Sequence, residues 1–407
     1  MLNRRSNSAD REFVTVSEGI RETKAEGIPG LDDLLQYLVD QRGSDLHVKV
    51  GASPHVRVDG HLQPAPFDPL GPADLERMAY AILPPAGADE FARTHEADFA
   101  LSIPGLGRFR VNTYRQRGTV GMVFRRVLPG IPSFEALGLP ATVQRLAEEP
   151  RGLVLVTGPT GSGKTTTIAS MIDHINETKS VNVVTIEDPI EVLHTDKKAI
   201  ISQREIGSDT VGFAQAMRRV LRQDPDVIFI GEMRDPETVW AALSAAETGH
   251  FVLSTLHTAN TVETVNRIVD FFPPHQHKQI RLSLATSLRG VCSQRLLERA
   301  DGKGQIPAVE VLVNTGAVAD NIRDTQKALN IPDLIAEGTV SYGMQSFDQS
   351  LMKWFKDGMI SYESALFYSS NPNEFALRAS GVDSASDRKF SEITGDTGAS
   401  RSLDLTP

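Results

Sequence analysis

The stretch GPTGSGKTTT, residues 158–167, sets the interpretation of this 407-residue sequence. It meets the pattern G-x-x-x-x-G-K-[ST] in full, with an apolar run over 153–156 before it and a helical pattern over 165–175 after it. Glycines lack a Cβ, so backbone N–H groups can approach a ligand closely, and a helix N-terminus attracts anions. The stretch therefore predicts a phosphate-binding loop between a strand and a helix, rather than a plain glycine-rich turn.

Each residue of this loop is a candidate nucleotide contact. We expect Lys164 to lie on the β- and γ-phosphates and the Thr165 hydroxyl to bind Mg²⁺. The candidates are Gly158, Pro159, Thr160, Gly161, Ser162, Gly163, Lys164, Thr165 and Thr166. The loop predicts nucleotide binding but does not say what the bound nucleotide is used for.

Length, charge and cysteine content limit the class of protein. A chain of 407 residues is too long for one typical core, and a net charge of −10 argues against a protein that mainly wraps nucleic acid. The single cysteine, Cys292, excludes an intrachain disulfide and fits a reducing compartment. The N-terminus lacks the apolar core of a signal peptide, and no apolar run approaches the roughly 20 residues that span a bilayer. We therefore expect a cytoplasmic protein without membrane insertion.

Hydrophobic periodicity divides the chain into segments. Strand-like runs with helical stretches precede residue 128, and from about 146 apolar strands alternate with helical patterns, as a mostly parallel α/β core requires. The expected segments are a flexible extension (1–30), a small α+β domain (31–128), a linker (129–145), a RecA-like core (146–296), a helical C-terminal region (297–372) and a disordered tail (373–407).

Carboxylates follow two of the apolar strands. Glu232 ends the run DVIFIGE, where P-loop enzymes place an acid that holds Mg²⁺ or polarises the attacking water, and the alternative is a surface glutamate. Glu187, Asp188 and Glu191 lie in TIEDPIE, where they could gather on the metal or on water. An N-cap role for Asp188 before Pro189 is an equal alternative.

Histidines and arginines add weaker candidates. His250 and His257 bracket the strand in TGHFVLSTLHT, and His257 is the better candidate for sensing the γ-phosphate, although a lone histidine is more often structural. A helix over DTVGFAQAMRRVLRQDP places Arg218 and Arg222 one turn apart, and an exposed basic face is as easily only solvated.

Together these motifs resemble the secretion-superfamily ATPases, and within them the type IV pilus retraction (twitching motility) ATPases of the PilT/PilU type. The resemblance covers roughly residues 31–370. It rests on GSDLHVKVGASPHVRVDGHL in the first domain and on four boxes in order: GPTGSGKTTT (Walker A), TIEDPIEVLH (aspartate box), LRQDPDVIFIGEMRD (Walker B) and AETGHFVLSTLHTANTVETVNRIVDFFP (histidine box).

The resemblance implies a PAS-like N-terminal domain, a RecA-like ATPase domain and a cytoplasmic homohexamer at the base of the pilus machine. It implies ATP and Mg²⁺ as cofactors, and the candidate Mg²⁺ ligands from the sequence pattern are Thr165, Glu232 and Glu187. It also implies that arginines complete the site. The matching candidates are Arg108, Arg110 and Arg125 in the first domain and Arg267 in the histidine-box helix.

The candidate catalytic residues are therefore Glu232, Glu187 and His257 from the sequence pattern, and Arg110 and Arg125 from the resemblance, which also makes Arg267 a candidate nucleotide contact. The implied partners are an inner-membrane platform protein and, as an open further partner, a paralogous retraction ATPase, without direct nucleic-acid binding.

The direction of work has indirect support. Extension-type relatives usually carry a further N-terminal domain and a tetracysteine zinc motif, which a chain with one cysteine cannot build and for which about 30 residues before Leu31 leave no room. Retraction is therefore the expected function. The open alternatives are an accessory PilU-like subunit with weak turnover and a related secretion or DNA-translocation ATPase.

Overall fold

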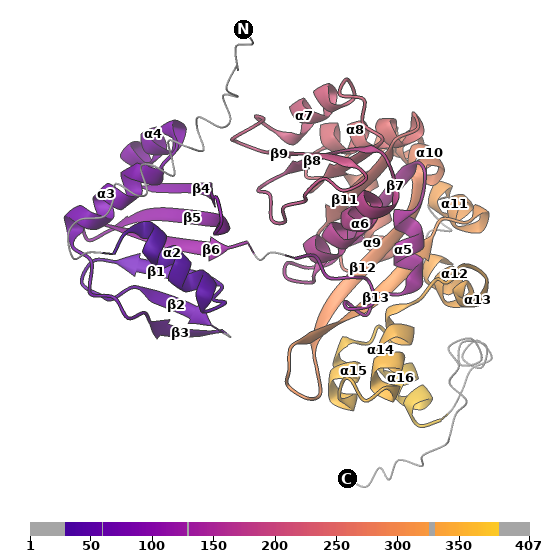
Figure 1. Ribbon diagram of the computed structural model, residues 1–407. Coiled ribbons are helices and arrows are strands. Elements are labelled where there is room, and N and C mark those ends of the chain that lie inside the picture. Colours follow the sequence, from indigo (N-terminus) through magenta and orange to yellow (C-terminus); the bar gives the residue numbers. More distant parts are fainter. Residues whose placement is uncertain (1–28, 59, 128–129, 325–329, 382–407) are drawn as a thin grey trace. The chain divides into compact units, whose positions relative to one another are not determined.

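A computed structural model describes residues 29–58, 60–127, 130–324 and 330–381 (Figure 1). The chain divides into two compact units, Met1–Gly130 and Ile131–Pro407. The expected extension up to residue 28 and the tail from residue 382 lie outside the described residues. In the described part of the chain, no helix is both long and apolar enough to cross a membrane.

The N-terminal unit is built on an antiparallel sheet with strand order β3-β2-β1-β6-β5-β4. Its strands are β1 (Asp45–Lys49), β2 (His55–Val58), β3 (His61–Pro64), β4 (Glu96–Ile103), β5 (Gly107–Gln116) and β6 (Thr119–Arg126). Its helices are α2 (Leu31–Asp40), α3 (Pro72–Ile82) and α4 (Pro85–Thr94).

Helix α2 shows why the N-terminal unit folds as one core. Leu31, Leu34, Leu35 and Leu38 recur at helical spacing, and each is fully buried. They pack in one cluster with residues of β1, β5 and β6 such as Phe109. The apolar stripe of the helix therefore covers one face of the sheet, as the sequence predicted for this α+β domain.

The second unit has a mostly parallel sheet with strand order β13-β12-β7-β11-β10-β8-β9, in which only β12 and β13 pair antiparallel. Its strands are β7 (Gly152–Thr157), β8 (Asn182–Glu187), β9 (Ile200–Glu205), β10 (Val227–Ile230), β11 (Phe251–Leu256), β12 (Leu288–Glu298) and β13 (Gln305–Val313).

Helices cover both faces of this sheet. They are α5 (Ala141–Ala147), α6 (Lys164–Thr178), α7 (Phe213–Val220), α8 (Pro236–Glu247), α9 (Thr261–Asp270), the 3₁₀ turn η1 (Pro274–Gln276), α10 (His277–Ser287), α11 (Gly316–Arg323), α12 (Ile331–Glu337), α13 (Thr339–Tyr342), α14 (Phe347–Lys356), α15 (Tyr362–Tyr368) and α16 (Pro372–Ala379).

Strand β7 shows why the parallel strands are continuously apolar. All six of its residues are buried, and they alternate between two cores. Leu153 and Leu155 pack with α8, α9 and α10, whereas Val154 and Val156 pack with α5 and α6. A strand covered on both faces needs apolar residues at every position. The fold class expected from the sequence, an α+β unit followed by a RecA-like α/β unit, is confirmed.

Three expected boundaries were wrong. The helical region 297–372 contains strand β13, which pairs with β12 over nine residues from Gly290↔Val313 to Glu298↔Gln305. In this strand Ile306 and Ala308 are buried against residues of the C-terminal helices. Helix α5 begins inside the expected linker 129–145, and α16 runs through the first part of the expected tail 373–407 because Phe375 is buried in the same C-terminal cluster.

Candidate nucleotide site

Three glycines shape the loop between β7 and α6. Gly158, Gly161 and Gly163 have φ of 144°, 79° and 89°, values that residues with a Cβ rarely adopt. A Cβ on Gly158 would also lie 2.4 Å from the carbonyl oxygen of Gln294 and 2.5 Å from Ser162 Oγ. The loop therefore depends on glycine at these positions, and it delivers the chain into the N-terminus of α6, whose first backbone N–H groups have no partner within the helix.

Lys164 is the first residue of α6 and is only 8% exposed. Its Nζ donates to the carbonyl oxygens of Gly158 at 2.8 Å and Pro159 at 3.0 Å, so the lysine closes over its own loop. Burial lowers the pKa of Lys164, and the carboxylates of Glu232 and Glu191 act in the opposite direction. A cation is thus held at the centre of the loop, where the sequence predicted a phosphate-binding lysine.

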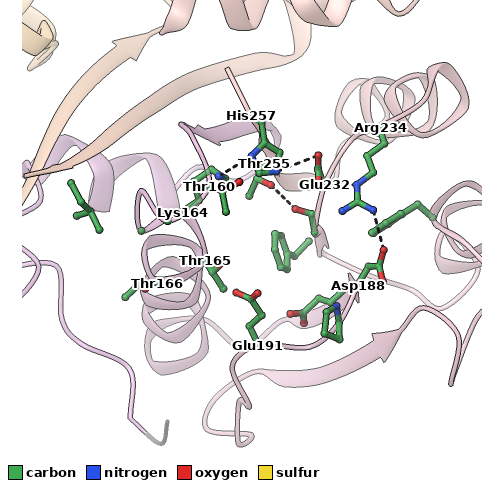
Figure 2. Close-up of a pocket in the computed structure, with 18 residues that line it drawn as sticks. Thr160, Lys164, Thr165, Thr166, Asp188, Glu191, Glu232, Arg234, Thr255 and His257 are labelled. Atoms are coloured by element: carbon green, nitrogen blue, oxygen red, sulfur yellow. Dashed lines mark hydrogen bonds and ion pairs between the residues drawn. The ribbon is translucent and has the colours of Figure 1, made fainter. Parts of the chain in front are cut away.

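Glu232 follows β10, at the edge where the parallel strands end. Its two carboxylate oxygens have different partners: Arg234 Nε donates to Oε2 at 2.8 Å, and His257 Nε2 lies 3.4 Å from Oε1. Arg234 also binds Asp188, with 3.1 Å between Nη1 and Oδ2. Arg234 therefore links the acids of two strand ends (Figure 2), and its guanidinium pKa is raised, mainly by the hydrogen bond to Glu232.

His257 lies between the lysine and the glutamate. It follows β11, and its Nδ1 is 3.4 Å from Lys164 Nζ while its Nε2 faces Glu232 (Figure 2). Strand β11 is the parallel neighbour of both β7 and β10, which places His257 between the ends of those two strands. The imidazole therefore contacts both the lysine and the glutamate of the site.

Glu187 is the most buried acid of the group, at 7% exposed. Its Oε1 accepts hydrogen bonds from Thr185 Oγ1 at 2.6 Å and from Gln203 Nε2 at 3.0 Å. Burial raises its pKa. Glu187 is thus held by β8 and β9 at the floor of the site. The N-cap alternative for Asp188 was wrong, because no helix begins in the described stretch between β8 and β9.

These side chains line one cavity of about 520 Å³. Such a volume lies within the range of small-ligand sites. Figure 2 shows Glu191 extending toward Thr165 across it. The lining residues are Thr160, Gly161, Gly163, Lys164, Thr165, Thr166, Glu187, Asp188, Pro189, Glu191, Phe213, Phe229, Gly231, Glu232, Arg234, Thr255, His257 and Leu296.

A second cavity of about 400 Å³ adjoins the first. The two share Gly163, Thr166 and Leu296, so the second begins where the phosphate loop enters α6. Its other walls come from the segment 135–139, from β13 and from Trp354 of α14. Ser162 also lines it, and the Ser162 hydroxyl is buried without a hydrogen-bond partner among the described residues.

None of the candidate arginines is among the residues that line the described cavity. In the N-terminal unit Arg110 and Arg125 are exposed and stand opposite each other in the register of β5 and β6. Arg125 Nε donates to Asp45 at 2.8 Å. Arg108 Nη1 donates to Ser102 Oγ at 3.2 Å. Arg267 of α9 is exposed over the Phe271 ring, 4.8 Å from its centre, and it is absent from the lining of the described cavity.

Other sequence candidates have local partners. His250 Nδ1 lies 3.0 Å from the carbonyl oxygen of Ala245, so this histidine completes the end of α8. Arg218 pairs with Glu237 on the surface, 2.8 Å apart. Sequence reasoning missed Arg234 and gave Glu191 no separate role. The signal for both was their position: Arg234 stands two residues after Glu232, which follows β10, and Glu191 stands four residues after Glu187, which ends β8.

Comparison with known proteins identifies relatives over most of the chain. The family model for Type II/IV secretion system proteins matches residues 107–331. The chain is 41% identical to the type IV pilus retractation ATPase PilT of Pseudomonas aeruginosa, over 85% of this chain and 99% of the relative. It is 39% identical to the type IV pilus ATPase PilU of the same species, over 91% and 98%. A crystal structure of the pilus retraction motor PilT with bound ADP matches with a TM-score of 0.79 and 44% identity, over 84% of this chain and 98% of that one.

Proposed function

The chain belongs to the type II/IV secretion system protein family, and we propose that within it this protein is an ATP-hydrolysing motor for type IV pilus retraction. One observation carries the proposal: Lys164, His257 and Glu232 line the same cavity, and the His257 imidazole contacts both the lysine cation and the glutamate carboxylate. The chain matches relatives named for pilus retraction over nearly the whole length of those relatives.

The loop fits a nucleotide on its own geometry. Three glycines in positive-φ conformations keep the loop open to backbone donors. The Ser162 hydroxyl, which has no hydrogen-bond partner among the described residues, is a further polar group within it. Phosphates would lie on the loop from Gly158 to Thr166. The Lys164 side chain would turn from the carbonyl oxygens of Gly158 and Pro159 to the β- and γ-phosphates. The second cavity, which begins at Gly163 and Thr166, would take the nucleoside.

Thr165, Glu232 and Glu187 are the proposed Mg²⁺ ligands, because hydroxyl and carboxylate oxygens suit this ion and all three line the same cavity. When bound, Mg²⁺ would neutralise phosphate charge and align the terminal phosphate. Glu187 keeps one oxygen on Thr185 and Gln203, so its buried carboxylate is fixed in direction.

Hydrolysis needs a water aligned with the γ-phosphate and positive charge on the oxygens that become more negative. We assign the water to Glu232, whose carboxylate is oriented by Arg234. His257 then contacts the γ-phosphate from the side of β11. Arg110 or Arg125 of a neighbouring subunit would supply the remaining charge, and Arg267 remains a candidate nucleotide contact.

Assembly and location complete the proposal. A site finished by arginines from another subunit requires a ring, and we propose a homohexamer at the cytoplasmic face of the inner membrane. It would bind the platform protein of the pilus machine and a paralogous retraction ATPase. Retraction is favoured over extension because the one cysteine, Cys292, is buried in the sheet and cannot contribute to a tetracysteine zinc site.

Turnover of the purified protein tests this function. We expect Mg²⁺-dependent ATP hydrolysis that rises with protein concentration as rings form and does not respond to DNA. The similarity to PilU makes an accessory subunit the second candidate. Rings that bind ATP with almost no turnover would favour that alternative. Hydrolysis that DNA stimulates and that salt suppresses steeply would indicate a translocase instead.

A further inference from the structure

Glu310 is a buried acid that the proposed reaction does not use. It lies on β13 and is 9% exposed, and burial raises its pKa. A buried carboxylate is costly unless hydrogen bonds satisfy it. The sequence did not single it out, because it stands inside the apolar run PAVEVLV that forms β13.

The hydrogen bonds to Glu310 come from the first residue of α9, and the charge of Arg295 also acts on its carboxylate. Both the backbone N and the Oγ1 of Thr261 donate to Glu310 Oε1, at 2.8 and 2.7 Å. Thr261 is fully buried, so neither donor could turn to water if the carboxylate were removed. Asn260 caps the same helix by accepting from the backbone N of Glu263 at 2.9 Å. The start of α9 is therefore fixed both by its own cap and by a strand from the far edge of the sheet.

The segment between β11 and α9 carries His257. Its first end is set by the parallel pairing of β11 with β7, and its second end is set at Thr261 by Glu310. Only three residues separate His257 from Thr261. A shift at Thr261 would therefore be passed through three residues to the imidazole, whose contacts to Lys164 and Glu232 are 3.4 Å each and lengthen with any displacement.

A chain of contacts between buried hydroxyl groups connects the start of α9 to β7, the strand before the phosphate loop. Thr258 and Thr264 Oγ1 atoms are 2.7 Å apart, Thr264 Oγ1 is 3.4 Å from Thr157 Oγ1, and Thr157 bonds Ser293 at 2.8 Å. Ser293 is the register partner of Glu310. Thr157 directly precedes Gly158, so the polar cluster joins the end of β7 to the start of α9.

We propose that Glu310 is a positioning residue for hydrolysis, which holds His257 against Lys164 and Glu232 by anchoring Thr261. The proposal rests on the proposed ATPase function and adds a residue that acts on the reaction without touching the nucleotide. A residue with only a structural role would change stability and leave the turnover of the folded protein unchanged.

The test compares two substitutions. Glu310→Gln keeps an oxygen acceptor for Thr261, whereas Glu310→Leu removes it and leaves two buried donors without a partner. We expect Glu310→Gln to keep kcat within about twofold and Glu310→Leu to lower kcat about 10- to 100-fold, since a misplacement of about 1 Å can cost 10²-fold. ADP binding should stay unchanged in both variants, because the loop itself is intact.

A double-substitution cycle isolates the pathway. In a His257→Ala background, Glu310→Leu should cause almost no further loss of kcat. Ser346→Ala is the matched stability control, because it removes the cap of α14 and should lower the melting temperature without changing kcat. Should Glu310→Leu fail to fold, Thr261→Val, which removes one of the two donors, should lower kcat about threefold and lose that effect in the same background.

A full kcat in Glu310→Leu, an equal loss with and without His257, or a Glu310→Gln as slow as Glu310→Leu would overturn the proposal. The imidazole NMR signal of His257 gives a readout without turnover. It should move in Glu310→Leu and stay in place in Glu310→Gln. If the wild-type protein hydrolysed no ATP, the proposed function would fail, and this signal would still decide whether Glu310 positions His257.

Discussion

The N-terminal and ATPase units place their candidate charges in different environments. In the N-terminal unit Arg110 and Arg125 lie on an antiparallel sheet, and the Arg125 side chain is 68% exposed and paired with Asp45. In the ATPase unit Lys164 is 8% and Glu187 is 7% exposed, at the carboxyl ends of parallel strands. Parallel strands bring side chains together at one edge, where charge is desolvated. On the antiparallel sheet, by contrast, the side chains of Arg110 and Arg125 are exposed to solvent.

This difference indicates which unit can form a nucleotide site from the residues of a single subunit. Buried charges interact strongly and are costly unless they are used or paired. Exposed arginines interact weakly until a partner surface covers them. We therefore expect the ATPase-unit residues to act in every subunit, and the N-terminal arginines to act only in an assembled ring.

Lys164→Ala should have the largest effect. Removal of the buried cation leaves phosphate charge without a counterion, so nucleotide binding and turnover should fall together, with turnover at least about 10³-fold lower. Binding of a fluorescent ATP analogue and phosphate release measure the two. Lys179→Ala is the matched control, because Lys179 also donates to backbone carbonyls, at Glu148 among others, but outside the cavity. ATP binding at wild-type strength in Lys164→Ala would contradict the role given to the loop.

Arg125→Ala or Arg110→Ala should come next, and only in rings. An arginine supplied by another subunit can contribute about 10³-fold in rate or more. Mixing such subunits with Lys164→Ala subunits should restore activity, since some sites then combine an intact loop with an intact arginine. Mixed rings that form without regaining activity would show that the arginines act within their own subunit.

Glu232→Gln should separate binding from hydrolysis. The loop is unchanged, so ATP should bind, but the charge that orients water is lost and turnover should drop about 10²-fold. Equilibrium binding and single-turnover rates on the same sample measure this. A folded Glu232→Gln protein that no longer binds ATP would refute the division of roles between Lys164 and Glu232.

The smallest effect concerns pH and stability in the ATPase unit. Burial lowers the pKa of His194 to about 4 from an unfolded value near 6.5. A depressed folded-state pKa contributes stability above pH 6.5 that is lost as the pH falls toward 4, at most about 3 kcal/mol. His194→Gln should therefore lose less thermal stability than the wild type between pH 6.5 and 4. Parallel curves for the two proteins would contradict this.

The sequence predicted what is local. The phosphate loop, Glu232 and His257 follow strands that sequence periodicity locates, and the structure brings them to one cavity. It did not predict contacts between distant strands: β13 was expected to be helical, and the carboxylate of Glu310 meets Thr261 only through the sheet. Arg234 was missed because its two partners, Glu232 and Asp188, become neighbours only when β10 pairs with β8.

One measurement tests the central claim, that ATP hydrolysis at this site drives pilus retraction. A strain that lacks this protein and carries either the wild-type gene or Glu232→Gln should be scored for surface pili and for twitching. We predict that the Glu232→Gln strain keeps or gains surface pili and does not twitch, while the wild-type gene restores movement. A Glu232→Gln strain without surface pili would show that the motor drives extension and would contradict the account.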